Sequence, residues 1–179
     1  MIDSTNNVGL TPSLALHPTT GNPYISHYDQ SAGDLKLAFP VTIGGDCGPG
    51  NTWSCNSLYF QNIDEFGLYS SIAFNSLGQW GIVYSAGFFG NGFRGIPAVG
   101  SSEIFWDEIE PLDFVTSNSL AQYSNGTSVV SYTSKAGLGE PTYLRLAEYT
   151  GSGGNCGNSW WLCQTITEIS GLGDKIHPF

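Results

Sequence analysis

The chain has 179 residues, of which 11% are charged, and its 15 Asp and Glu against 5 Lys and Arg give a formal net charge of −10. A negative surface repels phosphate backbones and anionic lipids, which argues against nucleic acid and membranes as partners. No stretch approaches the roughly 20 apolar residues of a membrane-spanning helix. The 24 glycines and the 13% aromatic content favour short strands and tight turns over helices.

The first group of expected strands covers residues 8–16, 24–28 and 35–39, with a fourth strand starting near Trp53. A turn at Thr20-Gly21-Asn22 separates the first two, and Gly and Asn tolerate the positive φ that a tight hairpin demands. The β-branched and aromatic residues between the turns are typical of strands. These features predict a meander of four antiparallel strands.

Two further groups follow the same order. Segments 66–74 and 114–122 resemble segment 8–16, and each is followed by a Gly-containing turn and a second strand at 81–85 or 128–132. A third strand is expected at 143–147, and fourth strands near Trp106 and Trp161. Four short antiparallel strands per unit of about 50 residues are typical of a β-propeller blade. We expect one all-β repeat domain over residues 1–179, with blades at about 8–64, 65–113 and 114–170.

The four cysteines form two close pairs, Cys47 with Cys55 and Cys156 with Cys163, in loops between the expected third and fourth strands. Zinc is the alternative, but the C-x-x-C spacing of a typical zinc site is missing. Each pair is therefore predicted to form a disulfide that clips its own hairpin. Disulfides favour an oxidising compartment, so we expect an extracellular or cell-surface protein. Residues 1–7 lack the basic and apolar regions of a signal peptide.

The loops resemble the sialidase-like, Asp-box propeller repeats, whose [ST]-x-[DN]-x-G-x-[ST]-W turn joins the third and fourth strands. Residues 153–160 match that turn except at the first position, and Asp46-Cys47-Gly48 with Thr52-Trp53 matches with two residues inserted. Residues 12–38 are similar to bacterial repeats of the form P-S-L-A-L…G-N-P-x-I-S-Y-Y-D…G-D-L-K-x-A. The resemblance implies a fold, and a structural role for Asp46, Asn155 and the tryptophans. The arginine triad of active sialidases is not matched, because the chain has only Arg94 and Arg145.

Three blades leave a propeller open, because a closed ring needs about four or more. Residues 171–179 resemble the first strand of a fourth blade. Two explanations are open. Two copies associate into a six-bladed ring, since pairing of a terminal strand is a low-cost route to an oligomer; or the chain is part of a longer propeller or a larger array.

The loops after the second strands and between blades are expected to share one face, where ligands bind. Aromatic rings beside carboxylates suit sugar recognition; alternatively, the tyrosines close the core and the acids are solvated. The candidate ligand-binding residues are Tyr28, Asp29, Asp34, Tyr84, Phe88, Arg94, Tyr132 and Asp113.

The sequence contains no phosphate-binding Gly loop and no nucleophile motif, so no catalytic residue or cofactor is assigned. The acidic run 107–113 offers oxygen ligands for calcium, but without the spacing of a dedicated loop it is interpreted as an exposed edge. The leading hypothesis is a non-catalytic module that recognises glycan or protein and forms homo-oligomers. The alternatives are a glycoside-processing enzyme that uses Asp29 and Asp113 in an assembled ring, or a purely structural repeat unit.

Overall fold

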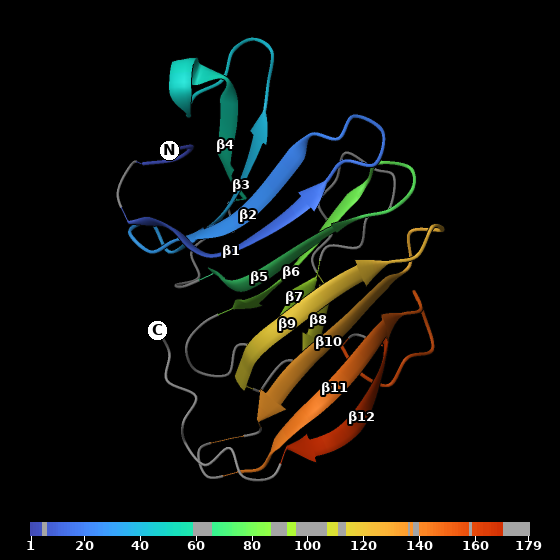
Figure 1. Ribbon diagram of the computed structural model, residues 1–179. Helices are drawn as coiled ribbons and strands as arrows, with labels where there is room; N and C mark the ends of the chain where they lie inside the picture. Colours follow the sequence, from blue (N-terminus) through green and yellow to red (C-terminus); the bar gives the residue numbers. More distant parts are fainter. Residues whose placement is uncertain are drawn as a thin grey trace.

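The computed structural model contains three β-sheets that follow one another in chain order, from blue to red in Figure 1. Neighbouring strands are antiparallel throughout. Within the described part of the chain the helical content is the short turn η1 (Pro49–Asn51), and no helix there is long and apolar enough to cross a membrane. The all-β prediction is confirmed. The structure describes residues 1–4, 7–58, 66–86, 93–95, 107–110, 114–135, 137, 140–157 and 159–169.

Each sheet is a meander of four strands, as expected. The first sheet has the order β1-β2-β3-β4, the second β5-β6-β7-β8 and the third β9-β10-β11-β12. The fourth strands begin at Trp53, Asp107 and Trp161, next to the predicted positions. The strands are β1 (Val8–Leu16), β2 (Pro23–Asp29), β3 (Asp34–Pro40), β4 (Trp53–Ser57), β5 (Phe66–Phe74), β6 (Trp80–Ala86), β7 (Phe93–Gly95), β8 (Asp107–Glu110), β9 (Phe114–Gln122), β10 (Ser128–Lys135), β11 (Thr142–Tyr149) and β12 (Trp161–Ile169).

The first strands of the first two sheets share the same irregularities. Gly9 and Gly67 have φ of 91° and 109°, and Thr11 and Tyr69 have φ of 46° and 52°. Both strands shift register twice, at corresponding steps of β1–β2 and β5–β6 pairing. Because bulges increase the local twist of a strand, β1 and β5 bend in the same way.

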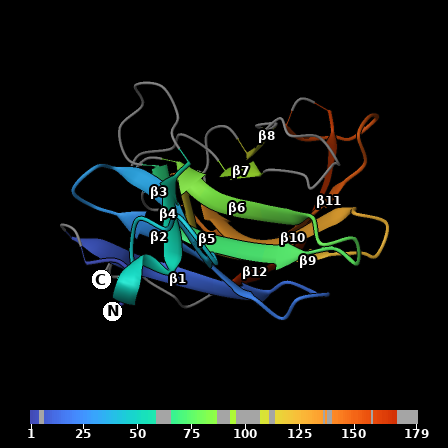
Figure 2. The same cartoon turned by 90° about the horizontal axis from the view of Figure 1, so that it is seen from above.

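Two apolar layers hold the sheets together, because each sheet packs one face against its neighbour. Leu35 and Leu37 of the first sheet contact Ile72, Ile82 and Tyr84 of the second. The next layer joins the second sheet to the third and contains Val83, Ile109, Val115, Leu120, Val130, Tyr132, Ala147, Trp161 and Cys163. The first strands lie nearest one another, β1 beside β5 and β5 beside β9, and Figure 2 shows the stack from above.

The stack is open at both ends. The sheets neither close into a ring nor adopt a propeller-like arrangement within the described residues, in contrast to the closed propeller that four or more blades would form. The number of blades stays a prediction, and the expected extra strand at 171–179 lies outside the described residues. We call the two faces turned away from the second sheet the first-sheet outer face (Leu14, Leu16, Ile25, His27, Lys36) and the third-sheet outer face (Ser119, Ser131, Thr133, Leu144, Leu146).

Candidate functional site

The two disulfides are present as predicted and close the hairpins before β4 and β12. Cys47 is bonded to Cys55 and Cys156 to Cys163. Asp46 and Asn155 stabilise the turns, because the side-chain oxygen of each accepts the amide of the second cysteine of its pair, at 2.8 and 2.7 Å. Asp46, Cys47 and Cys55 lie close enough to hold a metal, but the sulfurs are used by the disulfide. These loops are structural elements.

The three candidate ligand-binding tyrosines are buried. Tyr28, Tyr84 and Tyr132 are 3%, 0% and 1% exposed, and the last two lie in the layers between sheets. A ring that stacks on a sugar must reach the surface. In this structure the three rings instead contribute to the packing of the sheets.

Other candidate residues are only partly covered by the structure. Arg94 belongs to β7, where its backbone pairs with that of Tyr84. Phe88 and Asp113 lie outside the described residues. Of the acidic run considered for calcium, residues 107–110 form β8 and residues 111–113 are likewise outside them.

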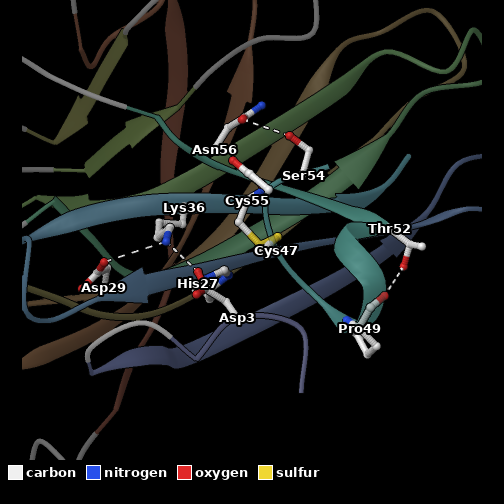
Figure 3. The surroundings of a disulfide bond; sticks show 11 residues. Asp3, His27, Asp29, Lys36, Cys47, Pro49, Thr52, Ser54, Cys55 and Asn56 are labelled. Atoms are coloured by element: carbon white, nitrogen blue, oxygen red, sulfur yellow. Dashed lines mark hydrogen bonds and ion pairs between the residues drawn. A yellow bond between two sulfur atoms is a disulfide. The ribbon is translucent and has the colours of Figure 1, made fainter. Parts of the chain in front are cut away.

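Asp29 belongs to a buried charge cluster with Asp3, His27 and Lys36, shown in Figure 3. The Nζ of Lys36 donates to the Oδ2 of Asp3 at 2.6 Å and lies 4.0 Å from the Oδ2 of Asp29. The Nε2 of His27 lies 3.7 Å from the same Asp3 oxygen, too far for a normal hydrogen bond but close enough for electrostatic attraction. Side-chain exposure is between 5% and 12% for all four residues.

The cluster is built by β-sheet register. His27 and Lys36 are direct cross-strand partners, and Asp29 pairs with Asp34 at the end of the same hairpin. Asp29 also organises the turn, because its Oδ1 accepts the amides of Ser31 and Ala32 at 3.0 and 3.1 Å. The fourth member, Asp3, comes from residues 1–4, so one carboxylate ties this segment to the first-sheet outer face.

Burial changes the titration of two groups here. It lowers the pKa of His27 below its ordinary value, against the opposing attraction of Asp3. It raises the pKa of Asp34, reinforced by the nearby charge of Asp29 and opposed by Lys36. The cluster thus keeps a neutral imidazole beside compensated carboxylates. This arrangement suits fastening the N-terminal segment better than presenting two carboxyl groups to a sugar.

Sequence reasoning missed Asp3, His27 and Lys36 as a group. The alternation along β2 and β3 places His27 and Lys36 on one face of a hairpin, and this signal could have paired them. Asp3 lies 33 positions from Lys36 and carries no such signal.

Neighbouring sheets also contact each other through a hydrogen bond between their first strands. A serine hydroxyl of one first strand accepts a backbone amide of the next. The Oγ of Ser13 accepts the amide of Ile72 at 3.2 Å, and the Oγ of Ser71 accepts the amide of Leu120 at 3.0 Å. These are corresponding positions, because Leu14, Ile72 and Leu120 follow the three serines Ser13, Ser71 and Ser119 and pair with Ile25, Ile82 and Val130. The contact therefore occurs once at each interface between sheets.

The outer faces leave apolar side chains in water. Leu14 and Leu16 are 60% and 61% exposed, whereas Ile72 and Leu120, at the position of Leu14 in the next two sheets, are 5% and 8% exposed. The same kind of side chain is thus buried wherever another sheet covers it. Within the described residues no sheet covers Leu14 and Leu16, whereas segment 1–4 lies against another part of this face, where Asp3 contacts His27 and Lys36.

Comparison with protein-family models and with curated proteins found no match to this chain. Its function is therefore inferred from the geometry above.

Proposed function

We propose that the chain is a non-catalytic interaction module that binds a protein surface through its outer sheet faces. The observation that carries the proposal is the exposure of Leu14 and Leu16 on a face whose equivalents are buried inside the stack. Leu14 and Leu16 are two positions apart on β1 and therefore lie on the same side of the strand, and neighbouring exposed apolar side chains of this kind are what an interaction site needs. Burying a leucine contributes about 1.5 to 3 kcal/mol, which gives such a contact a substantial driving force.

Glycan recognition is the rival function, and the burial of the tyrosines counts against it. Tyr28, Tyr84 and Tyr132 are at most 3% exposed, so the aromatic platform expected for sugars is covered. A glycoside-processing enzyme would need a carboxylate such as Asp29 to face substrate, whereas Asp29 lies beside Lys36 and accepts two amides of its own turn. Protein recognition needs neither an exposed aromatic platform nor a carboxylate that faces substrate. A purely structural unit, the remaining alternative, would have no binding partner.

The proposal extends to fold family and location. The three meanders are repeats of the Asp-box type, and because the described sheets are stacked without closing, further sheets would be needed to complete a propeller. Support comes from the repeated strand pattern, the paired bulges of β1 and β5 and the turn-stabilising roles of Asp46 and Asn155. The two disulfides are compatible with an extracellular location, and we propose that the protein works there.

The test of function uses the dye ANS, which fluoresces on exposed apolar surface. At sub-micromolar concentration the folded protein should bind ANS, and Leu14→Lys combined with Leu16→Lys should lower the signal more than the control change does, while other exposed side chains such as Ile43 and Ile166 keep part of it. Leu77→Lys is the control, because Leu77 is 75% exposed and belongs to the β5–β6 turn of the second sheet, not to the first-sheet outer face. Unchanged ANS binding in the double variant would contradict the proposal.

A glycan array and a panel of chromogenic glycosides test the rival functions on the same preparation. Both should be silent. Glycan binding or turnover that is lost in Asp29→Asn and retained in the Leu14→Lys, Leu16→Lys variant would replace the proposed function.

A further inference from the structure

The contact between sheets consists of an acceptor, the serine hydroxyl, and a donor, the backbone amide of the next sheet. Within the described residues, each end of the stack presents one of these two groups without its counterpart. Ser13 and Ser71 each accept an amide from the next sheet. Ser119, the third serine of the series, is exposed, and Leu14, which corresponds to the donors Ile72 and Leu120, lies at the opposite end. Among the described residues neither the Ser119 hydroxyl nor the Leu14 amide makes this contact. An acceptor is thus left at one end and a donor at the other.

Two leucines of β11 correspond to the leucines of β3 that pack against the second sheet. His27 and Tyr132 are corresponding residues of the second strands, and their cross-strand partners are Lys36 and Arg145. The leucines on either side of these partners therefore correspond as well, Leu35 and Leu37 to Leu144 and Leu146. Leu35 and Leu37 are 0% and 3% exposed beneath the second sheet. Leu144 and Leu146 lie on the third-sheet outer face and are only half-buried. The third sheet therefore offers the apolar surface that the first sheet uses to receive its neighbour.

A glycine provides a third correspondence, on the donor side. Gly67 lets β5 approach the first sheet, because a Cβ at this position would lie 2.6 Å from the Cβ of Leu35. Gly9 occupies the same place in β1 with a similar positive φ, yet a Cβ there would have nothing within 4 Å. Gly9 therefore keeps open a close approach that no described residue of the chain uses.

We propose that the occupant of both outer faces is a second copy of this chain, docked head to tail. The part of the first-sheet outer face that segment 1–4 leaves open, around Gly9 and Leu14, covers the third-sheet outer face of the next copy, so that Ser119 accepts the Leu14 amide and Gly9 lies over Leu144. The proposal deepens the proposed function by naming the partner and the register. Because the contact joins two different surfaces, it repeats from copy to copy and either closes a ring or extends a filament.

Two single-cysteine variants test the register. Leu14→Cys and Ser119→Cys should form a disulfide dimer when mixed under mild oxidation, with peptide mass spectrometry locating the bond between positions 14 and 119. Neither variant alone should cross-link. The four native cysteines do not interfere, because all are in disulfides. Leu77→Cys mixed with Ser119→Cys is the negative control. Ser71→Cys with Leu120→Cys in one chain is the positive control, since these positions form the same contact internally.

Light scattering over a concentration series gives a second, independent measurement. The wild-type mass should rise with concentration, and Ser119→Arg should weaken association at least about tenfold while leaving the unfolding midpoint unchanged, because Ser119 is exposed. Cross-linking of Leu14→Cys with itself would overturn the head-to-tail register. A monomer at high micromolar concentration would overturn self-association. Such a monomer leaves the proposed function intact only if Leu14→Lys combined with Leu16→Lys still lowers ANS binding below that of the Leu77→Lys control.

Discussion

Replacing Lys36 with Met should destabilise the protein through the two carboxylates that it leaves behind. Met is close to Lys in length, so the change removes the charge with little change in volume. The Nζ of Lys36 lies 2.6 Å from Asp3 and 4.0 Å from Asp29, and the carboxylate side chains are only 7% and 6% exposed. Neither can be fully hydrated when its counter-ion is gone.

The magnitude follows from the burial of the three side chains. Removing one partner of a buried ion pair typically costs about 3 to 5 kcal/mol, because the remaining charge stays in a poorly solvated site. The side chains of Lys36 and Asp3 keep 12% and 7% exposure and so some access to water, and we therefore expect the lower end, about 3 kcal/mol. For a domain of this size that corresponds to a fall of roughly 6 to 12 °C in melting temperature.

The assay is urea denaturation at neutral pH with a double-mutant cycle. Lys36→Met and Asp3→Asn should each destabilise the protein, but the double variant should cost clearly less than the sum, because it leaves no Asp3 carboxylate that has lost its Lys36 contact. A loss below about 0.5 kcal/mol for Lys36→Met, which is usual for exposed charges, would refute the burial argument. Strict additivity would refute the pairing with Asp3.

Three further outcomes can be measured on single variants. Gly67→Ala should destabilise more than Gly9→Ala by about 1 to 3 kcal/mol, because both strain a positive φ but only the former overpacks against the first sheet; equal losses would contradict the close approach. Because burial lowers the pKa of His27, the unfolded chain takes up a proton below about pH 6.5 before the native state does, so unfolding free energy should fall as pH drops through that value, and His27→Gln should flatten this slope. Changing both Cys156 and Cys163 to Ser should lower the free energy of unfolding by about 2.5 kcal/mol relative to the oxidised wild type, because the unfolded chain loses a closed loop. A loss under about 1 kcal/mol in urea denaturation would contradict this role of the disulfide.

The strand positions and disulfides could be predicted because they depend on neighbours in the chain. Gly21 and Gly126 have the positive φ that the hairpin turns require. The cysteine pairs are separated by 8 and 7 positions, so a single hairpin brings them together. The fourth strands start within one residue of the expected tryptophans for the same reason, since a turn and its strands are local.

The sequence could not predict which candidate side chains reach the surface, because exposure depends on which sheet covers which face. Tyr84 and Tyr132 lie on alternating strand positions that sequence alone could place toward solvent or core. Stacking of the sheets buries both. Leu14 corresponds to the buried Ile72 and Leu120 but is itself exposed, because no described sheet lies above it.

The sequence by itself determined the local structure of this protein: an all-β chain of three four-stranded meanders, two of them clipped by disulfides, because turns, alternation and short loops act over a few residues. Only the tertiary structure decided that the described sheets form an open stack and that Asp3 reaches Lys36. It also decided that equivalent residues such as Leu14 and Ile72 differ in exposure. These features depend on packing between sheets far apart in the chain, where the cost of burying a charge or exposing a leucine is set by the neighbouring sheet.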